Sequence, residues 1–295
     1  MDNILSVKDL TKNYGDNVVV NNVNFEIKKG SICGLLGPNG AGKTTIMKII
    51  MNQIKCDKGN ISYGDNLKIK YLQDVPEFYD FYTVEEYLEF ILDITKYSCS
   101  KYEKIEETLN LFDLKKYRNL KVKKLSRGLK QKLGIASVII DNPDILILDE
   151  PVSALDPIGR LEIFDILLSL KGKTTIIFSS HILTDVEKIC DQFILINNGK
   201  IILNEESKNM FLDRNNIVIE FKNREDLMII KENIKYESNF NENIENCLEV
   251  YCEDMDILQK DIFKMLVKNN IAINSISIKK NSLEEIFFKG VRANG

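Results

Sequence analysis

Short hydrophobic runs alternate with longer amphipathic segments over the first two thirds of the chain. The runs have the length and composition of buried strands, and they lie at residues 31–36, 69–72, 145–148, 175–178 and 193–196. Residues 83–139 carry hydrophobic side chains at helical spacing, whereas residues 4–27 alternate as paired strands do. This alternation predicts an α/β fold in which helices cover both faces of a parallel core sheet, with an antiparallel β subdomain beside it.

The pattern changes at a polar stretch, residues 204–216, which we interpret as a linker. The order β-α-β-β-α-β is expected after it, at residues 217–221, from 224, within 236–252, at 255–268 and at 271–278. A final helix is predicted to begin at Asn281, where Ser282 and Glu285 form a capping box. This order is typical of a small ferredoxin-like α+β domain. We therefore expect a first domain at residues 1–210, with a helical subdomain at 83–139, and an accessory domain at 216–295.

The composition is typical of a folded protein in a reducing compartment. Of the 295 residues, 44% are hydrophobic and 28% are charged, which excludes a largely disordered chain. The net charge of −4 provides no basic field, so no nucleic-acid partner is expected. The six cysteines include no C-x-x-C pair, and the single histidine, His181, excludes sites that need two imidazoles. Because no hydrophobic stretch reaches about 20 residues and no signal peptide is recognisable, we expect a cytoplasmic location.

A phosphate-binding loop (P-loop) is predicted where the first buried strand meets a helix. Eight consecutive residues fit the pattern G-x-x-x-x-G-K-[ST], namely Gly37, Pro38, Asn39, Gly40, Ala41, Gly42, Lys43 and Thr44. Glycines let backbone N–H groups approach phosphate oxygens closely, and the following helix points its positive end at the same anion. Lys43 is suited to the β- and γ-phosphates of a nucleotide, Thr44 is suited to Mg²⁺, and the adjacent Thr45 is counted with the same site.

Two carboxylates follow another predicted strand, at residues 145–148. Asp149 and Glu150 would stand at the carboxyl edge of the parallel sheet, where ligands bind in open α/β folds. Asp149 is suited to holding Mg²⁺, and Glu150 is placed to orient or deprotonate the water that attacks the γ-phosphate. The alternative is that the pair only caps the turn before Pro151, which the nearby P-loop makes the weaker interpretation.

The order of these motifs resembles that of the ATP-binding subunit of ABC transporters, over about residues 1–210. Besides the P-loop and the two carboxylates, three short motifs carry the resemblance: L-S-R-G-L-K-Q from Leu125, S-A-L-D from Ser153 and S-S-H from Ser179. The resemblance implies that Tyr14 stacks on adenine and that Asp156 belongs to the family's D-loop. It also implies that His181 contacts the γ-phosphate and stabilises the charged transition state or holds Glu150 and water in place.

The same resemblance implies two ATPase subunits that meet head to tail, as a homodimer or a heterodimer. The signature residues Ser126, Arg127 and Gly128 begin a helix and so form a second anion site. In this family that segment does not fold onto the P-loop of its own chain. Each P-loop would instead face Ser126 of the other subunit, and two ATP molecules would bind at the symmetric interface.

Two motifs depart from the commonest family pattern. Arg127 and Leu129 stand in place of residues of L-S-G-G-Q, although similar variants occur in cassettes of the bacitracin- and lantibiotic-resistance exporters. The Q-loop glutamine would stand three positions after Tyr71, where this chain has Asp74, and Gln73 comes one position early. Gln73 and Asp74 are therefore both candidates for reaching Mg²⁺ or the attacking water.

The resemblance implies an ATPase that converts ATP and water to ADP and phosphate and thereby drives a separate integral membrane permease. Such a subunit would lie on the inner face of the cell membrane, and the branch suggests export of a peptide, an antibiotic or another amphipathic compound. The aromatic residues within 76–82, among them Phe78 and Tyr79, would either contact the permease or pack inside the helical subdomain. Two alternatives stay open, namely a soluble ABC-type ATPase and an ATP-binding regulatory subunit without a transport role.

Overall fold

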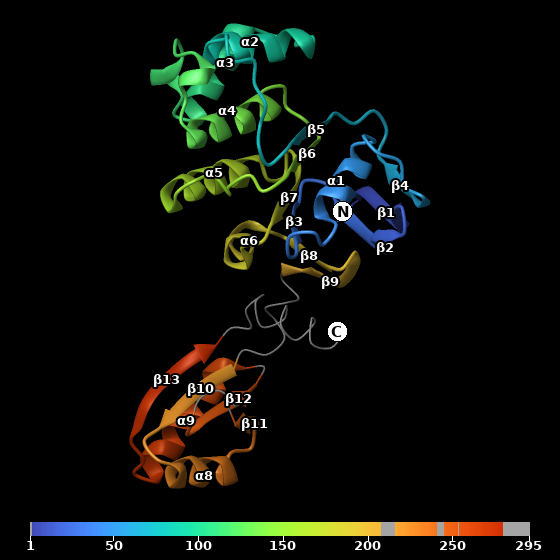
Figure 1. Cartoon of the computed structure of the whole chain (residues 1–295). Coiled ribbons are helices and arrows are strands. Elements are labelled where there is room, and N and C mark those ends of the chain that lie inside the picture. The colour runs from blue at the N-terminus through green and yellow to red at the C-terminus, as the bar shows by residue number, and fades with distance from the viewer. Residues whose placement is uncertain (1, 208–215, 241–244, 253, 280–295) are drawn as a thin grey trace. The chain divides into compact units, whose positions relative to one another are not determined.

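The computed structural model describes residues 2–207, 216–240, 245–252 and 254–279 (Figure 1). These residues form two compact units, with the boundary between Glu205 and Glu206. Each unit has a hydrophobic core of its own. The helix predicted from Asn281 lies outside the described residues.

The first unit is built around a six-stranded sheet with the order β5-β6-β7-β3-β8-β9. In that order, its strands are Ile69–Leu72, Ile145–Leu148, Thr175–Ser180, Ile32–Leu36, Gln192–Asn197 and Lys200–Glu206. The first five of them run parallel. Every residue of β3, β6 and β7 is buried, which explains their uninterrupted hydrophobic runs.

Helices cover both faces of this sheet. Figure 1 shows α5 (Pro157–Leu170) and α6 (Leu183–Ile189) on one side and α1 (Lys43–Ile50) on the other. A small antiparallel sheet with the order β2-β1-β4 packs beyond α1, and its strands are Asn17–Lys28, Asn3–Tyr14 and Lys58–Tyr63. One hydrophobic cluster joins α1 to both sheets. The parallel core with an antiparallel sheet beside it confirms the predicted α/β architecture of this unit.

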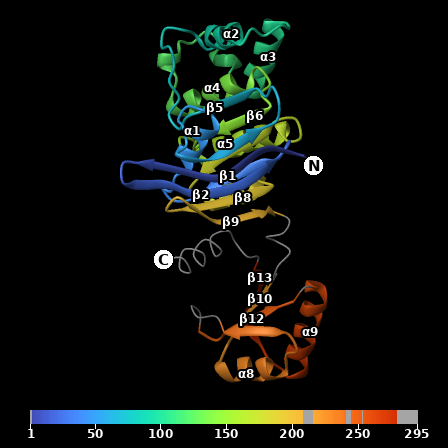
Figure 2. The ribbon, with the colours of Figure 1, turned by 90° about the vertical axis from the view of Figure 1, so that its right-hand side faces the viewer.

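The predicted helical subdomain consists of several helices rather than one continuous helix. They are α2 (Val84–Ile94), α3 (Lys101–Leu111), the 3₁₀ helices η1 (Lys115–Tyr117) and η2 (Val122–Lys124), and α4 (Arg127–Ile139). Figure 2 shows α2, α3 and α4 grouped at one end of the first unit. Thr83 and Glu86 form a capping box at the start of α2. The Arg118 guanidinium binds carboxylates of α2 and α3, and so ties these helices together.

The second unit has the element order that the sequence pattern predicts. Its elements are β10 (Asn216–Phe221), α8 (Arg224–Asn233), β11 (Glu237–Phe240), β12 (Cys247–Tyr251), α9 (Met255–Lys268) and β13 (Ile273–Lys279). The strands form an antiparallel sheet with the order β11-β12-β10-β13. This order places one strand between the two that each helix connects, as in a split β-α-β unit. Side chains of both helices and of the sheet share one buried cluster.

The prediction of a linker that starts at residue 204 was wrong at its beginning. Residues 204–206 belong to β9, which lies at the edge of the core sheet. An edge strand is held by backbone hydrogen bonds on one side and faces solvent on the other, so it tolerates polar side chains. The remainder of the expected linker, residues 208–215, lies outside the described residues.

Candidate active site

The P-loop follows β3 and ends at the first turn of α1, as the motif requires. Gly37 and Gly42 adopt φ angles of 150° and 106°. A Cβ atom on Gly37 would lie 2.2 Å from the carbonyl oxygen of Ile196, and one on Gly42 would lie 2.7 Å from that of Val19. Only glycine fits such close approaches between backbone segments. The two glycines therefore let the loop fold tightly against its neighbours while its N–H groups stay available for an anion.

Lys43 reaches back across the loop that precedes it. Its Nζ donates to the carbonyl oxygens of Gly37, at 2.6 Å, and of Pro38, at 3.3 Å. The same atom lies 3.8 Å from Oε1 of Glu150. Burial lowers the pKa of Lys43, and the nearby Glu150 and Asp149 carboxylates partly oppose that effect. The ammonium group is thus held between the loop and the carboxylates, where a phosphate would gain a strong donor.

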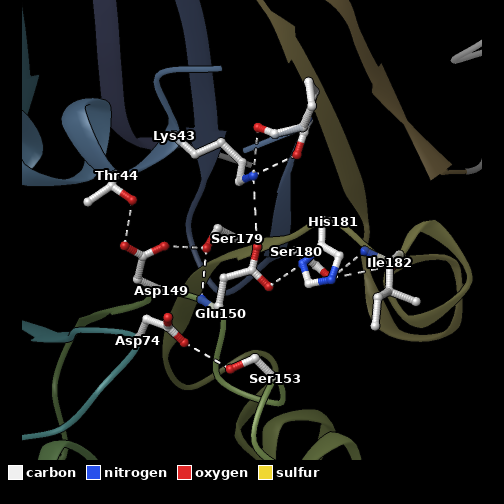
Figure 3. A network of polar contacts seen from close by, with 12 residues as sticks. Lys43, Thr44, Asp74, Asp149, Glu150, Ser153, Ser179, Ser180, His181 and Ile182 are labelled. Carbon is white, nitrogen blue, oxygen red and sulfur yellow. Dashed lines mark hydrogen bonds and ion pairs between the residues drawn. The ribbon is translucent and has the colours of Figure 1, made fainter. Parts of the chain in front are cut away.

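Asp149 connects the P-loop helix to the core sheet. It follows β6, and its Oδ2 accepts a hydrogen bond from Thr44 Oγ1 at 2.7 Å (Figure 3). Its Oδ1 accepts a second hydrogen bond from Ser179 Oγ at 2.6 Å. Both carboxylate oxygens therefore have a donor, one from α1 and one from β7.

Glu150 has a left-handed backbone conformation and one carboxylate oxygen without a hydrogen-bond partner. Its φ angle is 47°, in the left-handed region that residues other than glycine rarely adopt. Its Oε2 lies 2.9 Å from Nδ1 of His181, and its buried Oε1 has no hydrogen-bond partner. A buried carboxylate oxygen without a donor is costly in a folded protein unless a ligand or water meets it. Such an oxygen, beside a phosphate-binding loop, is suited to accept a proton from an attacking water.

These groups surround a cavity of about 240 Å³. Its lining consists of Val19, Pro38, Asn39, Gly40, Ala41, Gly42, Lys43, Thr44, Thr45, Asp74, Asp149 and Glu150. The structure thus brings most of the predicted P-loop residues together with both predicted carboxylates. Gly37 is not part of this lining, but it packs closely against the backbone of Ile196. His181 contacts Glu150, which lines the cavity.

The two Q-loop candidates lie in different surroundings. Asp74 lines the phosphate cavity, and its Oδ1 accepts a hydrogen bond from Ser153 Oγ at 2.8 Å (Figure 3). Gln73 donates from Nε2 to the carbonyl oxygen of Val75 at 2.9 Å and lines a separate groove. The geometry therefore favours Asp74 as the residue that faces the phosphate side of the site.

The remaining predicted site residues do not line the cavity. Tyr14 ends β1 with 52% of its surface exposed. Ser126 is the N-cap of α4 and accepts from the N–H of Leu129 at 3.3 Å, with Arg127 and Gly128 in the first turn of that helix. Asp156 caps α5 in the same way, by accepting from the N–H of Gly159 at 2.7 Å. Within one chain, none of these residues lines the phosphate cavity, and Ser126 and Asp156 each begin a helix.

The residues that meet at the P-loop suit Mg²⁺ bound together with a nucleotide. In the described part of the chain, no group of three or more His, Cys, Asp or Glu side chains could hold a metal ion. Thr44 and Asp149 nevertheless offer hard oxygen ligands next to the loop, and Mg²⁺ is commonly held by one or two such ligands plus phosphate oxygens. When bound, Mg²⁺ would neutralise phosphate charge.

The contacts of Ser179 and Ser153 with the site could not be predicted from the sequence. Ser179 lies in the quoted S-S-H motif, but its contact with Asp149 depends on β6 and β7 being neighbours in the sheet. Ser153 stands in the quoted S-A-L-D motif, and its contact with Asp74 joins two loops that are far apart in the sequence. The motifs named both serines, but only the strand order shows what they bind.

The chain has a strand, P-loop and helix, and its two carboxylates follow a parallel strand that is separated from the P-loop strand by β7 alone. These features define a P-loop nucleoside triphosphatase. A profile described as ABC transporter matches residues 20–153. The bacitracin transport ATP-binding protein BcrA of Bacillus licheniformis is 33% identical, over 98% of this chain and 97% of that protein. The lantibiotic transport ATP-binding protein SrtF of Streptococcus pyogenes is 39% identical, over 69% of this chain and 91% of that protein. The chain therefore belongs to the family of ABC transporter ATP-binding proteins, and it is an ABC-type ATPase.

A solved structure shows the same fold. A dimeric ATP-binding cassette in a post-hydrolysis state, bound to ADP and phosphate, aligns with a TM-score of 0.63 and 23% identity. The alignment covers 69% of this chain and 99% of that cassette.

None of the helices in the described ranges is long and apolar enough to cross a membrane.

Proposed function

We propose that this chain binds ATP and Mg²⁺ at the interface between two ATPase subunits and drives a separate membrane permease from the inner face of the membrane. The main support is that the predicted nucleotide contacts fall into two separate groups. The P-loop, Asp149 and Glu150 share one cavity, whereas Ser126, the N-cap of α4, is not part of its lining. A second subunit would supply the missing group and complete the site.

The groups in the cavity support separate roles in hydrolysis. Lys43 and the loop N–H groups would bind the β- and γ-phosphates, because they present the nearest positive charge and dipoles. Glu150 would accept a proton from the attacking water through Oε1, while His181 holds the other oxygen. Loss of the γ-phosphate contacts would then let the two subunits separate.

An N-cap substitution tests whether Ser126 acts across an interface. Ser126→Ala should lower ATP turnover at least tenfold while the Kd for ATP of the isolated chain stays the same, because Ser126 lies outside its own cavity. Ser100 is a matched control, since it caps α3 through Glu103 in the same manner. Each substitution removes a cap worth about 1 kcal/mol. Weaker ATP binding by the isolated Ser126→Ala chain, or an equal loss of turnover in Ser100→Ala, would contradict the proposal.

An aromatic surface next to the Q-loop supports the permease contact. Tyr79 and Phe81 are 54% and 62% exposed, and their ring centroids lie 5.9 Å apart. Phe78 instead packs edge-on against the buried Tyr87, at 5.1 Å between centroids. Exposed aromatic side chains are typical anchors of protein interfaces. The groove here has a volume of about 390 Å³ and is lined in part by Phe78.

The names of the relatives support a class of transported compound. BcrA and SrtF are described as bacitracin and lantibiotic transport proteins. Both compounds are peptide antibiotics, which supports a peptide, an antibiotic or a similar amphipathic compound as the substrate, and we propose that the chain powers its export. The relevant assay is resistance or efflux in cells that contain the chain together with its permease.

Substitution of the exposed aromatics tests this coupling. Tyr79→Ala and Phe81→Ala should lower efflux while the ATP turnover of the isolated chain is retained, because neither ring touches the phosphate cavity. Tyr102→Ala is a suitable control, since Tyr102 is 66% exposed on α3. Normal efflux in both aromatic variants would overturn the proposed permease contact.

A further inference from the structure

Ser179, at the carboxyl end of β7, contacts both carboxylate residues of the site. Its Oγ donates to Oδ1 of Asp149 at 2.6 Å and accepts from the backbone N–H of Glu150 at 2.8 Å (Figure 3). The side chain is fully buried, so water does not compete for either bond. We propose that Ser179 is a positioning residue for ATP hydrolysis, which fixes the Asp149 carboxylate and the Glu150 backbone at the same time. This inference rests on the role proposed above for Glu150.

The register of the sheet places Ser179 beside this pair. Strands β6 and β7 run parallel, with Leu148 opposite Phe178. The next residue of each strand is therefore Asp149 on one side and Ser179 on the other. A hydroxyl at this position reaches the carboxylate of Asp149 and the N–H of the following residue.

The hydrogen bond between the Glu150 N–H and Ser179 matters because the backbone of Glu150 is strained. A φ angle of 47° is strained for a residue other than glycine and persists only when its surroundings hold it. The N–H of Glu150 is directed to Ser179 Oγ, and the N–H of Asp149 to the carbonyl oxygen of Leu72 at 2.8 Å. If the Ser179 acceptor were lost, the buried N–H would be unpaired and the turn would relax. Oε1 of Glu150 would then move away from the position set beside Lys43.

The contact with Asp149 has a separate consequence. Thr44 and Ser179 each bind one oxygen of this carboxylate, and together they set its rotation. Groups that orient a metal-binding carboxylate typically change metal affinity or activity by 10–100-fold when they are removed. Ser179 should therefore affect both the chemical step, through Glu150, and divalent-cation binding, through Asp149.

The neighbouring Ser180 shows that the arrangement is specific to one serine. Its Oγ accepts from the N–H of Ile182 at 3.0 Å and is directed toward the carbonyl oxygen of the same residue, at 3.4 Å. It stabilises the turn after β7. Ser179 alone of the two bonds to the carboxylate pair in the described structure.

The test compares Ser179→Ala with Ser179→Thr, which keeps the hydroxyl. At saturating Mg²⁺, Ser179→Ala should lower kcat about 10–100-fold, since small displacements of reacting groups have effects of that size. The Kd for ATP measured in EDTA should stay within about twofold, because the P-loop is untouched. Ser179→Thr should recover most of kcat. Thr174→Val is the control for loss of a buried hydroxyl, since Thr174 binds the carbonyl oxygen of Pro143 away from the cavity.

A double-mutant cycle separates positioning from a general loss of structure. In single-turnover phosphate release at saturating Mg²⁺, adding Ser179→Ala to Glu150→Gln should cost less than threefold if Ser179 acts through Glu150. An equal loss in both backgrounds, or unchanged kcat in Ser179→Ala, would overturn the inference. If Ser179→Ala does not fold, the nearly isosteric Ser179→Cys, whose thiol is a weak donor, takes its place under the same criteria. Normal turnover in Glu150→Gln itself would instead refute the role proposed for Glu150.

A second measurement does not depend on turnover. Electron paramagnetic resonance of Mn²⁺ should show weaker binding, by about 10-fold or more, to the Glu150→Gln/Ser179→Ala chain with ATP than to Glu150→Gln with ATP. Unchanged Mn²⁺ affinity would contradict the part of the inference that concerns Asp149.

Discussion

His181 and Glu150 meet side chain to side chain, with Nδ1 of the histidine 2.9 Å from Oε2 of the carboxylate. His181 is the sole histidine of the sequence, and half of its side chain is exposed, whereas the Glu150 side chain is only 14% exposed. The imidazole thus covers one oxygen of Glu150 from the solvent side and leaves Oε1 directed toward Lys43 and the cavity. His181 therefore holds Oε2, whereas Oε1 stays available for reaction.

Glu150→Gln should reduce ATP turnover at least 100-fold and leave ATP binding intact. An amide is isosteric with the carboxylate but does not accept a proton from water, while Lys43 and the loop still bind phosphate. Phosphate release and equilibrium binding of a fluorescent ATP analogue measure the two effects. Equal and negligible turnover in wild type and variant would favour an ATP-binding regulatory subunit.

His181→Ala should lower turnover by about 100-fold, because Glu150 loses the group that holds Oε2 and no other histidine is present to replace it. The Kd for ATP should change little, since His181 is absent from the cavity lining. The measurement is kcat and Kd for the purified variant. A loss of ATP affinity with unchanged kcat would show that His181 acts in binding rather than in chemistry.

Gly37→Ala should destabilise the fold and abolish ATP binding. The added Cβ would lie 2.2 Å from a backbone oxygen, at a contact that neither segment can relieve by a side-chain rotation. Gly15→Ala is the control, because Gly15 also has a positive φ, 61°, but has open space around it. We expect thermal unfolding to report about 1 kcal/mol for Gly15→Ala and at least about 3 kcal/mol for Gly37→Ala. Equal losses would show that backbone conformation, not the close approach, is decisive.

Tyr236 should make the second unit lose stability at alkaline pH. The hydrogen bond to Asp261, at 2.7 Å, and burial raise the pKa of Tyr236 from 10.0 to about 12. Because the folded state holds this proton more tightly, the stabilisation is complete below pH 10 and is lost as the pH rises through about 12. The difference in melting temperature between wild type and Tyr236→Phe should therefore shrink between these pH values. A difference that is independent of pH would contradict the linkage.

The elements that depend on local pattern could be predicted from the sequence. The helix expected at residues 255–268 has those bounds in the structure, because its hydrophobic spacing is regular and Asp254 caps its start. The P-loop is likewise a contiguous motif, and its strand, loop and helix follow in the expected order. The family assignment is confirmed, since it depends on the order of several such motifs.

Contacts between distant segments could not be predicted in the same way. The choice between Gln73 and Asp74 depends on where each side chain points after β5, which a count along the sequence does not give. The Ser179 contact requires knowing that β6 and β7 are adjacent. Residues 204–206, the end of the edge strand β9, were predicted as linker because their side chains are polar, which an edge strand tolerates.

We propose that ATP joins two subunits through a site that neither completes alone. Light scattering of the Glu150→Gln chain with ATP and Mg²⁺ tests it most directly, because binding without turnover should trap the pair. We expect a particle with twice the mass of one chain and two bound nucleotides, and single chains when Lys43→Ala is combined with Glu150→Gln. A Glu150→Gln chain that binds ATP and keeps the mass of a single chain would show that ATP does not join two subunits.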